Sequence, residues 1–355
     1  MEKETNYFLR IEDSKFLYGI AILMMLFHHL FCNPQTLNSD FISVSGIYGG
    51  GIEVRIAWVC KLCVALYAFI SGYGLCRSHR GRTLQLQTNL KTGYKIVGRQ
   101  LINFYTKYWL VFGIFVPLRF LMFDRNLDPA EFLKNLLGLS YSYNGEWWYI
   151  QQYIGMLLIY PILDTLVGFV IRWNIWGKIF ISVGVAIAGI ICLTDWGEMI
   201  PGFTYMAIFS VGYLIARFEL FEKVSKGLKG YWIQALLGTA GTFSVLYIRY
   251  RITPYASWGR GDLFIVTLFI FFAALMNHTI LSSISKYIQY IGRYSVYMWL
   301  THTFYAYYYF QKFILLPRYT ILIFLWLLAI SLVTGIILDN VYHFLFNKIT
   351  GRGQD

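Results

Sequence analysis

The stretch KFLYGIAILMMLFHHLFC, residues 15–32, is apolar for most of its length and carries two adjacent histidines, His28 and His29, near its end. An α-helix needs about 20 apolar residues to cross a bilayer core of about 30 Å. Comparable apolar runs recur at residues 179–193, 263–276 and 320–338. The alternating pattern of a β-barrel is absent, so the sequence predicts an all-α protein whose helices cross a membrane.

The composition agrees with this interpretation. The chain of 355 residues is 57% hydrophobic and only 14% charged, whereas a soluble domain usually carries about 25% charged residues. We therefore expect a polytopic membrane protein that forms one integral membrane domain over residues 1–355. The pattern predicts about ten spans, at 16–33, 54–76, 100–122, 147–168, 178–194, 201–217, 231–249, 262–280, 290–311 and 319–345.

The basic residues indicate the orientation of the chain. Most of the 30 Lys and Arg residues fall in the N-terminal segment, the even-numbered connections and the C-terminal segment. The positive-inside rule then places both termini in the cytoplasm of a multi-pass cell-membrane protein, N-in and C-in. The net charge of +12 is explained by this topology, so we expect the lipid bilayer, and no nucleic acid, as a partner.

Four polar side chains fall within the predicted spans. At about 1.5 Å per helical residue, His29 and Lys61 each lie about 10 Å below the outer surface. On the same scale Gln152 lies about 8 Å below that surface, and His302 about 18 Å from the inner one. Ionisable groups at membrane depth are costly and mark candidate functional sites. The shared depth predicts one polar site built from four spans.

Structural interpretations stay open for the same residues. A histidine in a span is often a hydrogen-bonded helix contact, which applies to His28 and His302. Lys61 can extend its ammonium group toward the interface. Because neighbouring residues point about 100° apart on a helix, His28 and His29 cannot face the same groove. One of the two histidines is therefore expected to pack or to orient its neighbour.

Two further clusters carry less information. Arg77 and Arg80 are spaced i, i+3 at the inner end of the second span, and two guanidinium groups on one face suit phosphate. An ordinary basic flank gives the same pattern. The sequence CKLC places Cys60 and Cys63 on one helix face, but no second ligand pair accompanies them. We expect packing there and no metal site.

Four segments together resemble the acyltransferase family 3. They are GIAILMMLFHHLF, VALYAFISGYGLCRSHR, EWWYIQQYIGMLLIYP and IGRYSVYMWLTHTF, in this order along nearly the whole chain. The resemblance implies a membrane enzyme of about ten helices that O-acetylates a surface glycan. The implied donor is cytoplasmic acetyl-CoA, and the implied acceptor is a hydroxyl group of an exported or lipid-linked sugar. No metal cofactor is implied.

The resemblance also assigns roles to residues. His29 matches the family histidine and is expected to act as general base, or alternatively to carry the acyl group. Lys61 and Gln152 are the candidates for stabilising the oxyanion. The donor would be held by Arg77, Arg80, Arg99 and Lys15. The chain departs from the family at Tyr18, where an arginine is expected, so Lys15 or Arg10 must supply that charge.

Two other classes of function stay open. A transporter or flippase of a small polar solute or lipid-linked sugar would use the same intramembrane residues, although no internal repeat is visible. A glycan polymerase or ligase also has about ten spans, but usually with a larger external loop. Donor binding separates these classes, because only the transferase should bind acetyl-CoA. The sequence leaves the oligomeric state undetermined.

Overall fold

The computed structural model describes residues 7–33, 51–80, 90–123, 127–194, 202–252 and 259–350, without the side chains of 79–80 and 346–350. Within these residues the protein is helical and contains no strand, which confirms the all-α prediction. Five helical segments are long and apolar enough to cross a membrane, or six if the bent pair at 203–227 counts as one span. These five are Ile11–Phe31, Ile52–Ser78, Leu90–Phe123, Gly145–Leu193 and Thr320–Leu345.

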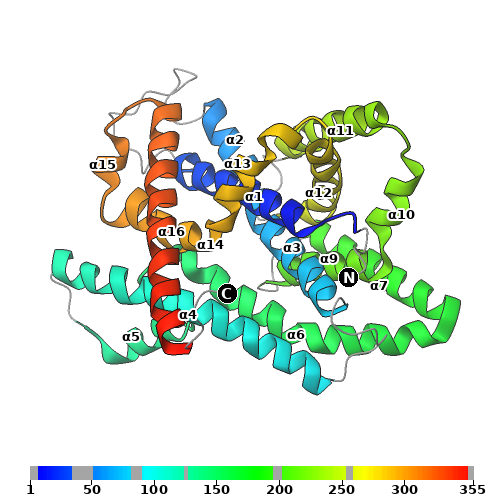
Figure 1. Ribbon diagram of the computed structural model, residues 1–355, viewed down its shortest axis with the longest axis horizontal. Coiled ribbons are helices and arrows are strands. Elements are labelled where there is room, and N and C mark those ends of the chain that lie inside the picture. Colours follow the sequence, from blue (N-terminus) through cyan, green and yellow to red (C-terminus); the bar gives the residue numbers. More distant parts are fainter. Residues whose placement is uncertain are drawn as a thin grey trace. The chain divides into compact units, whose positions relative to one another are not determined.

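Figure 1 labels the helices along the chain. In chain order they are α1 (Ile11–Phe31), α2 (Ile52–Cys60), α3 (Leu62–Arg80), α4 (Leu90–Phe123), α5 (Pro129–Leu136), η2 (Gly145–Trp147), α6 (Trp148–Val170), η3 (Ile171–Trp173), α7 (Asn174–Leu193), α9 (Phe203–Phe218), α10 (Leu220–Gly227), α11 (Tyr231–Ile252), α12 (Asp262–His278), α13 (Ser282–Arg293), α14 (Ser295–Thr303), η5 (Phe304–Tyr308), α15 (Gln311–Leu315) and α16 (Thr320–Thr350). Each of the ten predicted spans contains helix, while the number of crossings and the orientation stay predictions.

The predicted span 290–311 is wrong as a single helix. α13 ends at Arg293, α14 follows after Tyr294, and the π-helix η5 continues from Phe304. α13 is amphipathic and buries small residues against its neighbours. Its Gly292 approaches α1 so closely that a Cβ atom there would lie 1.9 Å from the carbonyl oxygen of Lys15. Large side chains at this position would prevent such a close contact. The contact lies directly beside the break between α13 and α14.

The chain forms two compact units, each assembled from three stretches. The first unit comprises Met1–Ala21, Trp58–Val97 and Gly155–Gly292, and the second comprises Ile22–Ala57, Gly98–Ile154 and Arg293–Asp355. Several helices, among them α1, α4 and α6, contribute residues to both units. The prediction of one domain over 1–355 stays a prediction.

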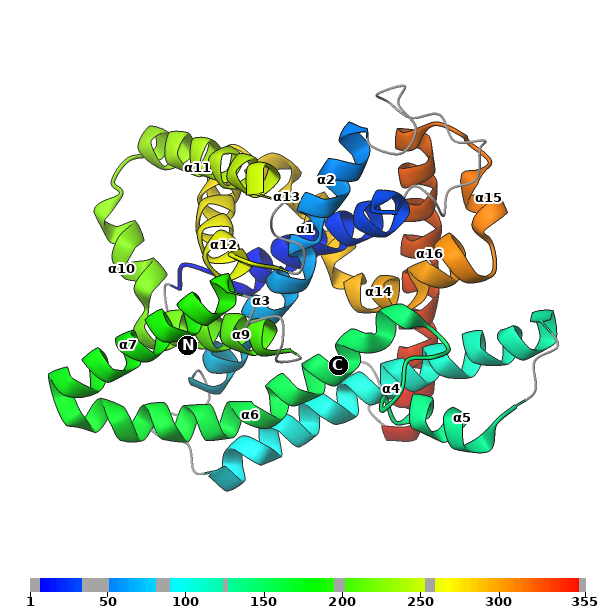
Figure 2. The same cartoon turned by 180° about the vertical axis from the view of Figure 1, so that it is seen from behind.

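The first unit is held together by close helix pairs. α3 packs along α9, where a Cβ atom on Gly72 would lie 2.0 Å from the carbonyl oxygen of Phe209. Small residues at such contacts let helix backbones approach, which is how helices associate where apolar burial gives no advantage. α11 and α12 lie side by side in both ribbon views (Figure 1 and Figure 2).

The second unit is built around aromatic rings. α14 packs against α16. The ring of Phe115 on α4 stacks on Phe304 with centroids 4.8 Å apart, and Trp147 meets the edge of Tyr108 at 4.9 Å. The indole of Trp147 also donates a hydrogen bond of 3.1 Å to the carbonyl oxygen of Leu300. Because Trp147 is fully buried, this bond satisfies its only donor and fixes the start of α6 against α14.

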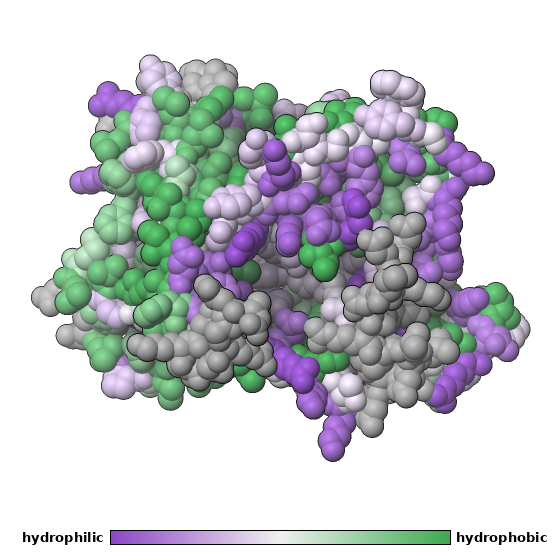
Figure 3. All heavy atoms as spheres, viewed as in Figure 1, coloured by the Kyte–Doolittle hydropathy of each residue, from purple (hydrophilic) through white to green (hydrophobic). Residues whose placement is uncertain are grey.

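The outer face of α16 is apolar. Its exposed large apolar side chains are Ile321, Leu322, Leu325, Trp326, Val333, Ile337, Phe344 and Leu345, and apolar residues gather over this helix in the space-filling view (Figure 3). An apolar face of this length is unfavourable in water and suits lipid. Together with its other long apolar helices, this makes the chain a multi-pass membrane protein.

The sequence of the connection between α4 and α6 predicts a short amphipathic helix, because Asp128 and Pro129 suit an N-cap and a first helical position, and the structure has this helix, α5. Asp128 caps α5 by accepting a hydrogen bond of 2.9 Å from the backbone N–H of Ala130, and Pro129 occupies the first position. Aspartate is favoured at the N-cap because its carboxylate accepts a hydrogen bond from a backbone N–H that has no partner within the helix. Proline is favoured at the first position because it has no backbone N–H to leave unpaired. The predicted amphipathic helix is confirmed, and it leads directly to the segment that holds Glu146.

Candidate functional site

His29 lies near the C-terminal end of α1 within the second unit. Its Nε2 atom is 3.5 Å from Oε2 of Glu146, and the side chains are 12% and 27% exposed, respectively. The hydroxyl of Tyr307 donates a short hydrogen bond to the backbone carbonyl oxygen of His29. The imidazole is thus mostly buried, anchored through its backbone and paired with a carboxylate that reaches the surface.

Glu146 is positioned by the residues on either side of it. The side chain of Asn144 accepts a 3.1 Å bond from the N–H of Glu146 and donates a 2.8 Å bond to Thr303. The N–H of Gly145 donates to the hydroxyl of Tyr308 at 2.8 Å. These bonds connect η2 to α14 and η5, and π-helical turns such as η5 are frequent at functional sites. The sequence analysis missed Glu146, although it stands alone as an acid at the start of an apolar run.

His302 is the third member of this site. Its ring centroid is 5.1 Å from that of His29, which confirms the predicted proximity of these two histidines. The residue is fully buried, and its Nδ1 atom bonds to the carbonyl oxygens of Trp299 at 2.8 Å and Met298 at 3.1 Å. Since carbonyl oxygens only accept, the proton sits on Nδ1. Nε2 is then an acceptor, and it has no partner among the described residues.

The other residues predicted near His29 differ in their surroundings. His28 is buried, and its Nδ1 atom lies 2.7 Å from the carbonyl oxygen of Ala57, so it ties α1 to α2. Gln152 is half-buried on α6 and makes no hydrogen bond to another described residue. Lys61 belongs to the first unit, at the turn between α2 and α3, with its ammonium 5.3 Å from the ring centroid of Trp58.

The arrangement around His29 is suited to proton transfer. A carboxylate beside one ring nitrogen favours the tautomer with a proton on that nitrogen and stabilises the imidazolium ion after the ring accepts a second proton. The same residues do not form a metal site, since no group of three or more His, Cys, Asp or Glu side chains in the described part of the chain could hold an ion. General acid–base chemistry is what these groups can perform.

Arg77 lies in the first unit and is already paired. Its guanidinium binds the carboxylate of Glu222 through a short contact, donates to the hydroxyl of Tyr73 at 3.3 Å, and lies 4.2 Å from the ring centroid of Tyr7. Both charged side chains are 9% exposed. The sequence left a phosphate-binding arginine and an ordinary basic flank open, and neither indicated the buried partner Glu222, 145 residues further along the chain, which neutralises much of the charge.

The remaining predicted donor residues fall on different helices. Lys15 is exposed on α1, and Arg99 is exposed on α4. The side chain of Arg80 lies outside the described residues. Tyr18, at the position where the family carries an arginine, stacks on Tyr67 with ring centroids 5.5 Å apart. Its role is therefore packing within the first unit.

A second histidine–carboxylate pair closes the start of α1. Asp13 is 1% exposed and accepts hydrogen bonds from the backbone N–H of Arg10 at 3.0 Å, from Asn277 at 2.9 Å and from Nε2 of His278 at 2.8 Å. The Nε atom of Arg10 adds a fourth contact at 3.4 Å. This pair fixes the beginning of α1 to the end of α12.

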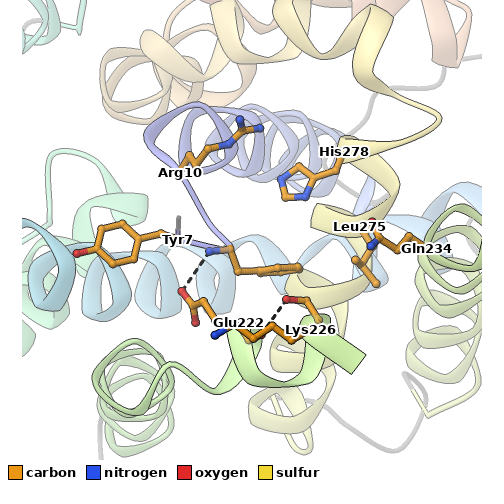
Figure 4. Close-up of a pocket in the computed structure, with 9 residues that line it drawn as sticks. Tyr7, Arg10, Glu222, Lys226, Gln234, Leu275 and His278 are labelled. Atoms are coloured by element: carbon orange, nitrogen blue, oxygen red, sulfur yellow. Dashed lines mark hydrogen bonds between the residues drawn. The ribbon is translucent and has the colours of Figure 1, made fainter. Parts of the chain in front are cut away.

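A cavity of about 460 Å³ opens beside this pair in the first unit (Figure 4). Arg10 and His278 lie on one side of it, and Glu222 and Lys226 on the other. The remaining lining residues are Tyr7, Phe8, Ser225, Gln234 and Leu275. The cavity therefore combines basic groups with aromatic walls.

Comparison with known proteins gives one result. A family model described as an acyltransferase domain matches residues 15–339, nearly the whole chain. No curated protein and no solved structure matches the chain. The matched range includes His29, Glu146 and His302, as well as the cavity residues of α10 and α12.

Proposed function

Because the chain belongs to the acyltransferase family 3, we propose that it transfers an acetyl group from acetyl-CoA to a hydroxyl group of an exported or lipid-linked glycan. The family and the long apolar helices support a membrane acyltransferase in general terms. Our proposal adds four points to this general statement: the donor, the acceptor, the cell membrane as the location, and the cytoplasmic position of both termini. The observation that carries the proposal is the pairing of His29 with Glu146.

In this mechanism His29 acts as general base. It removes the proton from the acceptor hydroxyl, and the hydroxyl oxygen attacks the carbonyl carbon of the thioester. Glu146 stabilises the imidazolium ion that forms, as the aspartate of a hydrolase triad does. When the C–S bond breaks, the imidazolium returns its proton to the leaving thiolate. His29 is neutral again at the end of the cycle.

The developing oxyanion needs donors. Gln152 fits this role because its amide N–H groups make no hydrogen bond to another described residue, and Lys61 is the second candidate from the sequence. The anionic end of the donor is assigned to the basic residues Arg77, Arg80, Arg99 and Lys15. Since Arg77 is bound to Glu222, we expect it to contribute less to donor affinity than an unpaired arginine would.

Transfer of radiolabelled acetyl from acetyl-CoA, measured in membranes that contain the protein, tests the proposal. The wild type should label the glycan or lipid-linked fraction. His29→Ala should lower the rate by about 1,000-fold, within the range for loss of a general base. His28→Ala is the matched control, because it removes the neighbouring ring, whose bond goes to the backbone of Ala57. It should reduce the amount of folded protein and leave its specific activity largely intact.

Calorimetry with acetyl-CoA separates this function from its main alternative. The purified wild type should bind the donor, and a protein with Arg77→Ala and Arg80→Ala should bind it more weakly. Equal loss of transfer in both histidine variants would refute His29 as the base. If the folded wild type binds no acetyl-CoA, a transporter or flippase of a polar solute becomes the better explanation.

A further inference from the structure

The acidic groups around the cavity of the first unit are already compensated. Asp13 accepts four contacts from Arg10, Asn277 and His278 and is buried behind the cavity wall. Oε1 of Glu222 accepts from the N–H of Phe8 at 3.1 Å and from Tyr73 at 3.2 Å, and the carboxylate is paired with Arg77. Neither carboxylate is therefore left as an unbalanced negative charge in the cavity.

The basic groups that line the cavity retain unused capacity. The two terminal nitrogen atoms of Arg10 make no bond to another described residue, and the side chain is 63% exposed. The ammonium group of Lys226 has no partner among the residues that the structure describes, and its side chain is exposed. In His278, Asp13 holds Nε2, so Nδ1 is the nitrogen left for the cavity.

We infer that this cavity binds a phosphate ester. A guanidinium fork and an ammonium group on opposite sides match a dianion, and the fork can bind two phosphate oxygens at once. Because Nε2 of His278 faces the Asp13 carboxylate, Nδ1 is the ring nitrogen that can form a hydrogen bond with the ligand.

The cavity also has room for the organic part of such a ligand. A volume of about 460 Å³ lies within the usual range for small-molecule sites, which runs from about 300 to 1,000 Å³. The rings of Tyr7 and Phe8 form apolar wall. The amide nitrogen of Gln234 is committed to the carbonyl oxygen of Leu228 at 2.8 Å, so its oxygen faces a ligand as an acceptor for a hydroxyl group.

Two sources could supply this chemistry, a soluble nucleotide and the headgroup of an anionic lipid. The inference concerns the cavity alone and does not depend on His29 acting as a base. If the nucleotide binds, the cavity is the place where a phosphate-bearing donor would be held, which deepens the proposed function. If the lipid binds, the cavity is a lipid site in a membrane protein.

The experiment compares two doubly substituted proteins of equal charge. Arg10→Gln with Lys226→Gln removes both cations of the cavity. Lys223→Gln with Lys229→Gln is the matched control, since both lysines are exposed nearby in the sequence and neither lines the cavity. Adenosine 3′,5′-bisphosphate and adenosine are titrated by calorimetry in neutral detergent. Native mass spectrometry in nanodiscs with phosphatidic acid or phosphatidylcholine measures bound lipid.

We expect the wild type to bind the bisphosphate or the phosphatidic acid, but not the uncharged or zwitterionic counterpart. The cavity variant should lose about tenfold or more in affinity, which corresponds to about 1.4 kcal/mol, and the control should stay within about twofold. The single variant Lys226→Gln, at an exposed residue, guards against misfolding and should lose part of the affinity. Equal loss in the cavity variant and the control would reduce the effect to net charge and overturn the inference. So would a folded wild type that binds neither phosphate ligand.

Discussion

The second unit and the first unit each contain a histidine paired with a carboxylate, but the two pairs differ in separation and in exposure. In the first, His278 and Asp13 lie 2.8 Å apart, and Asp13 also accepts from Arg10 and Asn277. In the second, His29 and Glu146 are 3.5 Å apart and the carboxylate is 27% exposed. The first pair lies at hydrogen-bond distance and its carboxylate is buried, whereas the second has a longer separation and a more exposed carboxylate.

The difference shows what identifies a reactive histidine. A carboxylate that holds four contacts in a buried position fixes two helices and cannot reorganise without breaking them. A half-exposed carboxylate beside a mostly buried ring can tighten as charge develops on the imidazole, and catalytic hydrogen bonds are often long before substrate binds. The backbone around Glu146 is held by bonds of the N–H groups of Gly145 and Glu146, and these bonds do not involve the Glu146 carboxylate.

Neutralising each carboxylate in turn is the strongest test of this comparison. Glu146→Gln should lower kcat for acetyl transfer by about 100-fold or more, because the imidazolium loses its counter-charge, while the thermal midpoint stays within error. Asp13→Asn should have the reverse pattern, with a lower thermal midpoint and an unchanged specific activity of the protein that stays folded. The measurements are steady-state kinetics and thermal unfolding in detergent.

The outcome depends on the contrast between the two variants. A loss of activity in Asp13→Asn that matches the loss in Glu146→Gln would mean that both pairs serve the reaction. An unaffected Glu146→Gln would remove the carboxylate from the mechanism. His278→Gln is the control for the first pair, because the glutamine amide can still donate to Asp13. Its thermal midpoint should therefore stay closer to that of the wild type than the midpoint of Asp13→Asn.

The pair of Arg77 and Glu222 extends the comparison to a buried pair of opposite charges. Arg77→Met alone should cost about 3 kcal/mol of the free energy of unfolding, because it leaves the Glu222 carboxylate buried without its counter-ion. Adding Glu222→Met should recover most of that cost, since replacing both buried partners by apolar residues is often neutral. Chemical denaturation of the single and double variants measures this.

Donor affinity in the same variants separates stability from binding. If the double variant is stable and binds acetyl-CoA as tightly as the wild type, Arg77 is a structural residue. A stable double variant with a raised Kd would mean that Arg77 also contacts the donor.

His302 is the next test, because its Nε2 atom is buried without a partner. A buried unpaired acceptor costs stability, and such groups persist where function uses them. His302→Leu should therefore leave the thermal midpoint unchanged or raised, while transfer falls about tenfold, equivalent to about 1.4 kcal/mol of transition-state stabilisation. Thr301→Val, at an equally buried neighbour whose hydroxyl bonds within α14, is the control. A variant that keeps full activity would make His302 a packing residue.

Much of this architecture could be predicted from the sequence. Apolar runs and low charge predict the long helices, and the pair Asp128 and Pro129 predicts α5, because these signals act over a few residues. Counting residues along two spans places His29 and His302 at a similar depth, because both spans cross the same thickness of bilayer. Local and one-dimensional signals were sufficient for these features.

The partners of charged residues could not be predicted in the same way. Asp13 meets His278 across 265 residues of sequence, and Arg77 meets Glu222 across 145. No local pattern indicates such pairings, because they depend on how separate helices pack. The break between α13 and α14 was missed for the same reason, since it accompanies the contact of Gly292 with α1.

A third carboxylate, Glu131 on α5, gives the smallest and most local test of the contrast. Its Oε1 atom accepts hydrogen bonds from Ser140 at 2.5 Å and Ser142 at 2.6 Å, and these bonds, that of Ser140 first, lower the pKa of Glu131 below its usual value. The order that the carboxylate gives to residues 137–143 should be fully present above the pKa of the unfolded chain and lost as pH falls through the lower folded-state pKa. Hydrogen exchange of these residues between neutral and acidic pH, analysed after correction for the intrinsic pH dependence, should show increasing exposure in acid. Glu131→Gln should already be more exposed at neutral pH and should vary less with pH. A loop that is equally protected in both proteins would mean that the hydroxyl and amide donors of Glu131, unlike the donors of Asp13, leave a carboxylate without structural effect.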